Sequence, residues 1–327
     1  MTFIPDRSIQ LVVTSPPYFN AREYSSWSTF DAYMSDMRIV INEVFRVLGN
    51  HRRFVLNVAD VTCDDGSGTS KKFAIPAHFI VACEDAGFSC IDDYIWDKGE
   101  VQTNRLPGKD DEYPYYIYPA NCYEHVIVFQ KDVRDTTRIP CPACGSLQTQ
   151  MNSKTRDTIV TWECNNEDCS HRSPSNRGKR FSARSVMMNA GRIESNRVPR
   201  PVMQRWRRDV VSFPPVIKID AGGKNKAGHS APYPVEIPRW AIAYHSHVGD
   251  VILDPFAGIF TTTVAAIKLN RNSIGIEISK DHVAAAKKRL QIGKLQSTLF
   301  GEVPRFIMKT TNDVERDGII FSTDIRN

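Results

Sequence analysis

The sequence predicts an α/β fold in which a mainly parallel sheet has helices on both faces and carries a small inserted module. Three observations predict it. Short apolar runs alternate with segments of helical periodicity in residues 1–130 and again in 209–290, as in parallel sheets whose strands are joined by helices. In residues 131–208 this periodicity fails, and Cys, Arg, Ser and Asn dominate. The chain has 327 residues, 41% of them hydrophobic, so it can bury a sizeable core.

The first half of the domain is expected to contain four strands and two helices. Residues 9–14 are apolar and end at two prolines, which predicts a strand followed by a turn. Apolar residues then recur at helical spacing from Met34 to Leu48, and Gly49 can end that helix. The remaining elements expected here are a strand over 54–61, a helix over 75–86, and strands over 91–96 and 125–129.

The second half resumes the alternation after a linker rich in Gly and Lys, residues 221–228. Ser279 is a suitable N-cap for the last clear helix, which runs to about residue 290. Residues 291–327 show no pattern and are interpreted as a C-terminal tail. The other elements expected here are a helix over 234–246, a strand over 251–253, a helix over 262–269 and a strand over 273–276.

The composition argues against a membrane or secreted protein. No apolar run approaches the ~18 residues that a membrane-spanning helix needs. The first ten residues, MTFIPDRSIQ, lack the basic and then apolar pattern of a signal peptide. We therefore expect a cytoplasmic protein that makes no contact with a membrane.

Four of the eight cysteines are clustered. Cys141 and Cys144 form one close pair, and Cys164 and Cys169 form another. Such spacing lets four thiolates converge on one tetrahedral ion, which predicts a closed structural zinc site. The alternatives are four free thiols, or His171 as the fourth ligand in place of Cys169.

The inserted module is basic. Between Lys131 and Arg208 the chain has 16 Lys and Arg against 7 Asp and Glu, although its overall net charge is only +5. This excess suggests a polyanionic partner, and arginine suits bidentate contacts to guanine or phosphate. The alternative is a solvated, loop-rich insert. Trp162 and Trp206 are expected to belong to the core of the module.

A glycine turn follows the strand over 251–253. The segment Asp254-Pro255-Phe256-Ala257-Gly258 leads into the next helix, where Thr261 and Thr262 lie near unpaired backbone N–H groups. Glu277 ends the following strand, where a carboxylate can accept hydrogen bonds from ribose hydroxyls. Together these features favour a nucleoside cofactor over a tight connection without a ligand.

The segment Thr14-Ser15-Pro16-Pro17-Tyr18 follows the first strand, at the edge of the sheet where α/β ligand sites lie. Two prolines hold the backbone extended and leave their carbonyls as fixed acceptors. Ser15 adds a hydroxyl and Tyr18 a flat ring. This combination suits a planar amino group, whose protons the acceptors would hold while the ring stacks on the base. The alternative is a loop that only ends the strand.

Three segments, residues 14–18, 254–258 and 229–234, together resemble motifs of one enzyme family. In this order they are similar to the catalytic motif, the cofactor motif and its flanking segment in the β-class, or permuted, DNA amino-methyltransferases. The resemblance covers roughly residues 5–130 and 209–290, and the insert falls where this family has its target-recognition region. It implies a Rossmann-like methyltransferase sheet, S-adenosylmethionine as cofactor and double-stranded DNA as substrate, in a restriction-modification context with the enzyme near the nucleoid. A homodimer is one candidate for the assembly of the protein.

The resemblance also implies roles for individual residues. Ser15, Pro16, Pro17 and Tyr18 would hold a base flipped out of the duplex. The cofactor pocket would be lined by residues of the glycine turn and the helix after it, by Glu277 and by the flanking segment: Asp254, Pro255, Phe256, Gly258, Thr261, Thr262, Glu277, His229, Pro232 and Pro234. With Ser at position 15, the catalytic motif resembles that of the members that methylate cytosine N4 more than that of the members that methylate adenine N6.

Two departures from the family pattern keep other functions open. Phe260 stands where the cofactor motif usually has a second glycine, so its ring is expected to crowd the methionine part of the cofactor. The acidic strand end that usually precedes the catalytic motif is not visible before Ser15. The alternatives are therefore an adenine-N6 enzyme, a DNA-binding homologue with impaired catalysis, and an RNA methyltransferase, since zinc ribbons also bind RNA.

Overall fold

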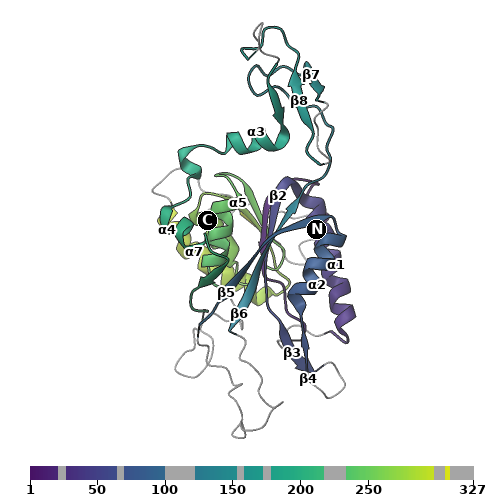
Figure 1. Cartoon of the computed structure of the whole chain (residues 1–327). Helices are drawn as coiled ribbons and strands as arrows, with labels where there is room; N and C mark the ends of the chain where they lie inside the picture. Colours follow the sequence, from purple (N-terminus) through teal and green to yellow (C-terminus); the bar gives the residue numbers. More distant parts are fainter. Residues whose placement is uncertain are drawn as a thin grey trace.

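A central sheet organises the protein (Figure 1). The computed structural model describes residues 1–20, 27–64, 70–99, 122–152, 158–171, 178–216, 233–297 and 306–309. In this part of the chain, the sheet consists of β10 (Val210–Ser212), β5 (Phe88–Asp97), β6 (Tyr123–Lys131), β2 (Leu48–Val58), β1 (Ile9–Thr14), β11 (Val251–Asp254), β12 (Asn272–Ile276) and β13 (Phe306–Lys309), in that spatial order. Strand β6 runs antiparallel to β2 and β5, whereas the other neighbouring pairs are parallel. The predicted mixed α/β fold with a mainly parallel sheet is confirmed.

Helices cover both faces of the sheet because its strands are apolar on both sides. Val12 and Phe54 pack under α1 (Phe30–Val47) and α2 (Ile75–Asp85). Their neighbours Leu11 and Val55 point the other way, toward α5 (Glu236–His245) and α6 (Thr261–Lys268). Helix α7 (Lys280–Ser297) packs beside α6. None of the described helices is long and apolar enough to span a membrane.

Several element boundaries differ from the prediction. Strand β2 begins at Leu48, ahead of the predicted residue 54, because Leu48 pairs with Ile9 of β1 before a break in register over residues 49–52. A hairpin of β3 (Val61–Asp64) and β4 (Ser70–Phe73) was not expected. In the tail, where no pattern was visible, Phe306–Lys309 adds an edge strand parallel to β12. These segments are too short or too polar to show periodicity, and pairing with a neighbour forms them.

The cysteine-rich segment forms its own small sheet, which projects from the main domain at the top of Figure 1. Strands β7 (Thr149–Met151), β8 (Thr161–Cys164) and β9 (Arg180–Ser182) pair antiparallel. Trp162 and Phe181 are buried there beside the cysteines, as expected for Trp162. Helix α3 (Ala183–Ala190) and the short α4 (Arg200–Arg205) lead the chain back to the main sheet, where β10 pairs with β5.

Trp206, in contrast, is not part of the core of the small module. Its ring stacks on Trp240 of α5, with centroids 4.0 Å apart and planes 9° from parallel, and it also contacts Phe213. Both tryptophans belong to the cluster beneath α5 on the main sheet. The end of the insert is therefore anchored in the core of the main domain.

Replacing Trp206 with alanine is expected to lower the free energy of unfolding of the main domain by about 3–5 kcal/mol, because a large cavity would open against Trp240. Urea unfolding monitored by fluorescence would measure the change. Arg207, the exposed neighbouring residue, provides the control variant Arg207→Ala. A loss below about 1 kcal/mol for Trp206→Ala would contradict the anchoring role.

Candidate active site at the ends of three strands

The catalytic-type segment and the glycine turn lie side by side. Strands β1, β11 and β12 are parallel neighbours, so the residues that follow them meet at one edge of the sheet. Thr14 ends β1 and donates a hydrogen bond of 2.6 Å to Oδ1 of Asp254, which ends β11. The structure thus brings together two motifs that are 240 residues apart in the sequence.

Asp254 is fully buried and held by several donors. The hydroxyl of Thr262 donates to its Oδ2 at 2.6 Å, and the backbone N–H of Phe256 donates to its Oδ1 at 3.1 Å. Tyr233 in turn bonds the hydroxyl of Thr262. Because all the direct partners of this carboxyl group are donors, the arrangement suits the ionised form. It fixes the start of the glycine turn against the catalytic segment.

Burial raises the pKa of Asp254 from 3.8 to about 6, against the effect of these hydrogen bonds. The folded protein therefore binds a proton here between pH 4 and 6 that the unfolded chain does not. The contribution of Asp254 to the free energy of unfolding should fall by up to about 3 kcal/mol as pH rises through this window, and stay level above it. Urea unfolding of the wild type and Asp254→Asn at several pH values isolates this contribution. A difference between the two that is constant from pH 4.5 to 7 would contradict it.

The glycine turn is joined to Glu277, which directly follows β12. Gly258 has φ = 51°, a conformation that favours glycine, and its N–H donates to Oε2 of Glu277 at 2.7 Å. The N–H of Ser279 donates to Oε1 at 2.8 Å. His282 Nδ1 also lies 3.4 Å from Oε1, and Oε2 can accept a further hydrogen bond. The carboxylate is thus oriented beside the turn, as a contact to ribose hydroxyls requires.

Phe260 does not crowd this turn, which corrects the expectation from the sequence. Its side chain is fully buried among Val283, Ala286 and Leu290 of α7. The ring lies against Gly275, where an added Cβ would be only 2.3 Å from a ring carbon. Because Gly275 has no side chain, the Phe260 ring fits between β12 and α7. Phe260 itself has φ = 61°, so the left-handed conformation typical of glycine is kept at this position.

The segment after β1 combines a hydroxyl, a ring and a neighbouring carboxylate. Pro16 is buried, whereas Ser15, Pro17 and Tyr18 are half-buried. The Tyr18 hydroxyl donates to Oε2 of Glu124 at 3.0 Å and lies 3.5 Å from Oγ of Ser15. Burial and the Glu124 carboxylate raise the pKa of Tyr18 well above its ordinary value, so the hydroxyl keeps its proton.

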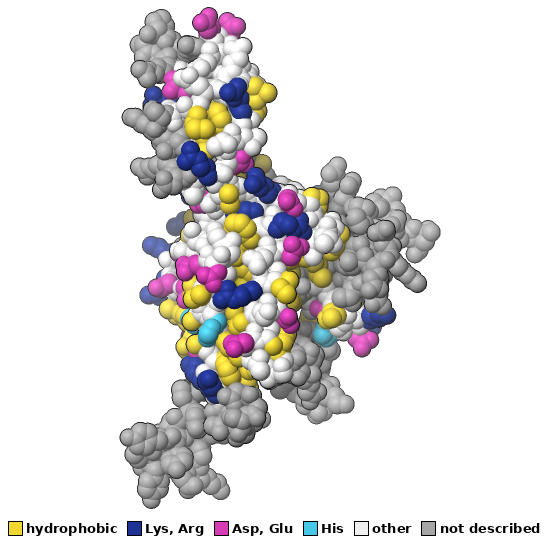
Figure 2. Space-filling model, turned by 90° about the vertical axis from the view of Figure 1, so that its right-hand side faces the viewer, with side chains coloured by type: hydrophobic (Ala, Val, Ile, Leu, Met, Phe, Trp, Pro, Cys, Tyr) yellow, Lys and Arg dark blue, Asp and Glu magenta, His cyan; other side chains and the backbone are white. Residues whose placement is uncertain are grey.

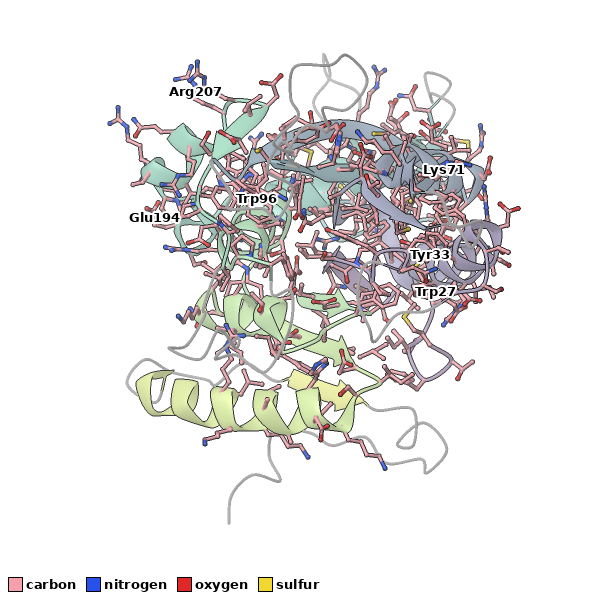
Figure 3. All side chains as sticks on the ribbon, turned by 90° about the horizontal axis from the view of Figure 1, so that it is seen from below. Trp27, Tyr33, Lys71, Trp96, Glu194 and Arg207 are labelled. Atoms are coloured by element: carbon pink, nitrogen blue, oxygen red, sulfur yellow. The ribbon has the colours of Figure 1, made fainter. Side chains whose placement is uncertain are left out.

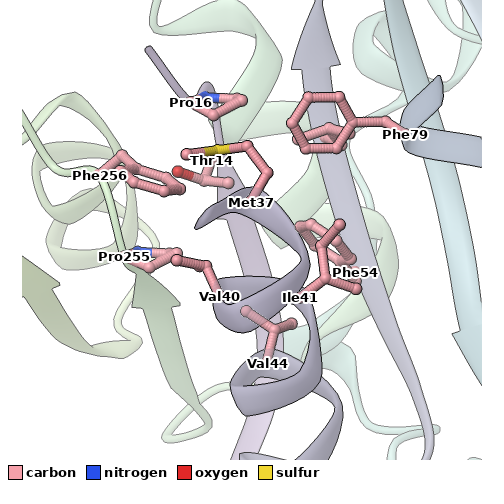
Figure 4. Close-up of a pocket in the computed structure, with 11 residues that line it drawn as sticks. Thr14, Pro16, Met37, Val40, Ile41, Val44, Phe54, Phe79, Pro255 and Phe256 are labelled. Carbon is pink, nitrogen blue, oxygen red and sulfur yellow. The ribbon is translucent and has the colours of Figure 1, made fainter. Parts of the chain in front are cut away.

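An apolar hollow separates the two motifs from helix α1 (Figure 4). Pro16 from the first segment and Pro255 and Phe256 from the glycine turn form one side. Met37 and Val40 of α1 form the other. The ends of β1 and β11 thus face apolar side chains of α1 across this hollow.

The remaining residues expected in the site are only partly covered. Pro234 is buried at the start of the segment that leads into α5. Thr261 accepts a hydrogen bond of 3.3 Å from Arg289. His229 and Pro232 lie outside the described residues.

The four clustered cysteines have the geometry of a metal site. Their Sγ atoms all lie within 4.8 Å of one another, with 4.0 Å between Cys141 and Cys169 and 3.7 Å between Cys144 and Cys164. Disulfides would need about 2.05 Å, whereas tetrahedral zinc–thiolate bonds of about 2.3 Å place sulfurs roughly 3.8 Å apart. The residues present therefore fit Zn²⁺ as the sequence predicted, with His171 not needed among the ligands.

Lys131 is buried, whereas the other described basic side chains of the insert are exposed or half-buried. On the face shown in Figure 2, Lys and Arg lie on both the small module and the main domain, mixed with acidic residues. Arg207 and Glu194 lie at the periphery, in contrast to the buried Trp96 (Figure 3). Of the arginines predicted to contact a polyanion, Arg172 and Arg177 lie outside the described residues.

Sequence analysis missed several polar residues at this edge. Thr14 and Tyr233 stand within segments that it quoted, but only the fold shows that they bind Asp254 and Thr262. Asn57 was detectable as a polar residue within an apolar run, and Glu124 as a carboxylate shortly before the apolar run 126–129. Lys98 also belongs to this edge, because its Nζ is 3.3 Å from Oε1 of Glu124 and its side chain is 12% exposed.

A family comparison now agrees with this geometry. Residues 9–288 match the family model described as DNA methylase. The chain belongs to this family of DNA amino-methyltransferases. The match runs from the start of β1 into α7, so it includes both motifs at the sheet edge and the insert between them.

Curated relatives of this methylase span different lengths. It is 32% identical over 292 residues to the type II beta methyltransferase M.BslI of Bacillus sp. strain NEB-606, covering 88% of this chain but only 26% of that protein. The orphan methyltransferase M.BamHII of Bacillus amyloliquefaciens is 26% identical, with 88% of this chain and 91% of that protein covered.

Solved structures agree on the fold of the methylase. TTHA0409 of Thermus thermophilus, solved in complex with S-adenosyl-L-methionine, superposes with a TM-score of 0.58 at 23% identity, covering 95% of this chain and 93% of that one. PvuII DNA methyltransferase, described as cytosine-N4-specific, gives a TM-score of 0.52 at 17% identity, covering 88% and 81%.

Proposed function

We propose that this methylase transfers a methyl group from S-adenosylmethionine to N4 of a cytosine in duplex DNA. The observation that carries the proposal is the Thr14–Asp254 hydrogen bond, which places the Ser15–Tyr18 segment beside the glycine turn and Glu277. The segment proposed to bind the amine and the turn proposed to bind the nucleoside thus lie at one sheet edge. Ser15 rather than Asp or Asn at the first motif position favours cytosine over adenine.

The chain's own residues would orient the target amine. The lone pair of an exocyclic amine is delocalised into its ring, so the amine is a weak nucleophile. Acceptors at Ser15 Oγ and the Pro16 carbonyl would bind its N–H protons and localise the lone pair on nitrogen. Because the target base lies inside a duplex stack, it would have to be flipped out, and Tyr18 would stack on it.

The turn and the strand end after β12 would hold the cofactor. Glu277 would accept hydrogen bonds from the ribose, while the backbone of Asp254–Gly258 approaches closely because of the turn at Gly258. When bound, S-adenosylmethionine supplies an activated methyl group on a sulfonium. Catalysis then depends mainly on how these residues align the acceptor amine with that methyl group.

The cysteine module would recognise the DNA. Cys141, Cys144, Cys164 and Cys169 would hold a structural Zn²⁺, so that β7, β8 and β9 present a stable surface. The arginines of α3, α4 and the segment around them would contact phosphates or guanine edges. Binding should therefore weaken steeply with salt.

The test is methyl transfer from labelled S-adenosylmethionine to unmethylated genomic DNA, followed by mass spectrometry of the nucleosides. N4-methylcytosine is expected. N6-methyladenine alone would overturn the choice of base, while the absence of both product and cofactor binding would overturn the reaction. Competition with structured RNA separates the DNA enzyme from an RNA methyltransferase. The position of Phe260 removes one sequence argument for a homologue with impaired catalysis.

A further inference from the structure

A carboxylate that the sequence analysis did not include stands directly beside the catalytic-type segment. Glu124 is the second residue of β6. Since β6 runs antiparallel to β2 and β5, its first residues lie at the edge where those strands end. That edge also carries the segment after β1. The side chain of Glu124 is 16% exposed.

Three donors from three parts of the fold hold this carboxylate. Tyr18 from the segment after β1 donates to Oε2 at 3.0 Å, and Nδ2 of Asn57 from β2 donates to the same oxygen at 3.1 Å. Nζ of Lys98, just after β5, lies 3.3 Å from Oε1. Asn57 also donates to the carbonyl of His125 at 3.1 Å and is 1% exposed, so the carboxylate is held on a rigid strand.

The chemistry of these groups sets the direction of the hydrogen bonds. An ionised carboxylate only accepts, so the Tyr18 hydroxyl must donate to Glu124. The Tyr18 oxygen can then accept a hydrogen bond from the hydroxyl of Ser15, 3.5 Å away. If Ser15 donates to Tyr18, the lone pairs of Ser15 Oγ are left for a partner on its other side. Such hydrogen bonds are often long without substrate and shorten in the reactive complex.

We propose that Glu124 is a positioning residue that acts through Tyr18 to make Ser15 Oγ an acceptor toward the amino group of the target base. This inference rests on the proposed function, because it assigns Ser15 and Tyr18 their roles in methyl transfer. Lys98 balances the charge of Glu124 and holds it in place, and Asn57 holds it from the strand behind. In this proposal Glu124 acts only through Tyr18 and is assigned no contact with the base or the cofactor.

A merely structural role for Glu124 predicts different behaviour. If it only held the segment together, its loss would impair an enzyme lacking the Tyr18 hydroxyl as much as the wild type. If it acts through that hydroxyl, its substitution has no further effect once the hydroxyl is absent. A double-mutant cycle between the two residues separates these cases.

The experiment compares wild type, Glu124→Gln, Glu124→Leu and Tyr18→Phe, together with both Glu124 variants in the Tyr18→Phe background. Single-turnover rates on duplex DNA, KM for DNA, calorimetric Kd for S-adenosylmethionine and thermal unfolding are measured for each. Glutamine keeps an acceptor for Tyr18 and leucine does not. Glu84→Gln, at an exposed position on α2, is the matched control.

The rate is expected to fall in the order wild type, Glu124→Gln, Glu124→Leu, with a loss on the order of tenfold or more for leucine. The Kd for the cofactor should stay within about twofold. In the Tyr18→Phe background, the three residues at position 124 should give equal rates. If Glu124→Leu does not fold, the rates of Glu124 and Glu124→Gln, each compared with Tyr18 and with Tyr18→Phe, still show whether Glu124 acts through the Tyr18 hydroxyl.

Two outcomes would overturn the inference: unchanged rates in both single Glu124 variants, or losses that are equally large in the Tyr18→Phe background. A wild type that makes no methylated product under any condition would instead overturn the proposed function, and this inference with it. The wild-type product assay thus distinguishes the two failures.

Discussion

Ser15→Ala should lower the rate of methyl transfer by on the order of a hundredfold or more. The substitution removes the hydroxyl oxygen that would accept a proton of the target amine, so less of the lone pair is directed toward the methyl group. The Ser15 hydroxyl faces Tyr18, whereas the glycine turn is held by Glu277, so the Kd for S-adenosylmethionine should stay the same. Single-turnover methylation of duplex DNA and calorimetric titration of the cofactor measure these two quantities separately.

Ser35→Ala is a suitable control for this substitution, because Ser35 is exposed on α1, outside the site. It should methylate at the wild-type rate. Undiminished turnover in Ser15→Ala would refute the role given to the Ser15 hydroxyl. An equal loss of cofactor affinity and rate would show instead that Ser15 supports the cofactor pocket.

The sequence predicted the long, regular elements of the fold well, because their apolar periodicity is strong. Helix α1 and strands β1 and β11 lie close to their expected positions. The early start of β2 at Leu48 and the edge strand β13 were not predicted, since both depend on pairing with neighbouring strands. Trp206 shows the same limit: its burial was foreseen, but its stacking on Trp240 depends on tertiary contacts.

The sequence predicted the site residues that lie within recognisable motifs, but not those outside them. Asp254 and Glu277 were found because strand–turn–helix patterns mark the edge of a sheet. Glu124 was not, because β6 enters the sheet antiparallel, and the sequence does not show that its first residues would meet Tyr18. The direction of Phe260 was wrongly anticipated for a related reason, since the space that accepts its ring is created by Gly275 on the next strand.

Cys164→Ser should release the metal ion and unfold the cysteine module while the main sheet stays intact. Structural zinc sites contribute about 10–16 kcal/mol in zinc-finger peptides, far more than a three-stranded sheet of this size can replace. Cys164 is buried with Trp162 and Phe181, so the loss of one ligand also disturbs the small core of the module. The clusters beneath α1 and α5 contain no residue of β7–β9 and should keep their stability.

Elemental analysis and hydrogen exchange followed by mass spectrometry measure both parts of this expectation. Wild type should hold one zinc ion per chain, and Cys164→Ser close to none. Exchange should accelerate in β7, β8 and β9 but not in β1 or β11. Cys90→Ser, a half-buried cysteine on β5, controls for the loss of a thiol and should keep the metal. If wild-type protein purified in the presence of zinc holds none, or if Cys164→Ser retains zinc fully, these four thiolates do not form a structural metal site.

The same variant tests whether the module recognises DNA. An unfolded segment cannot present arginines in a fixed arrangement to the duplex. If Cys164→Ser loses zinc but still methylates specific DNA at the wild-type rate, the module is not needed for target recognition.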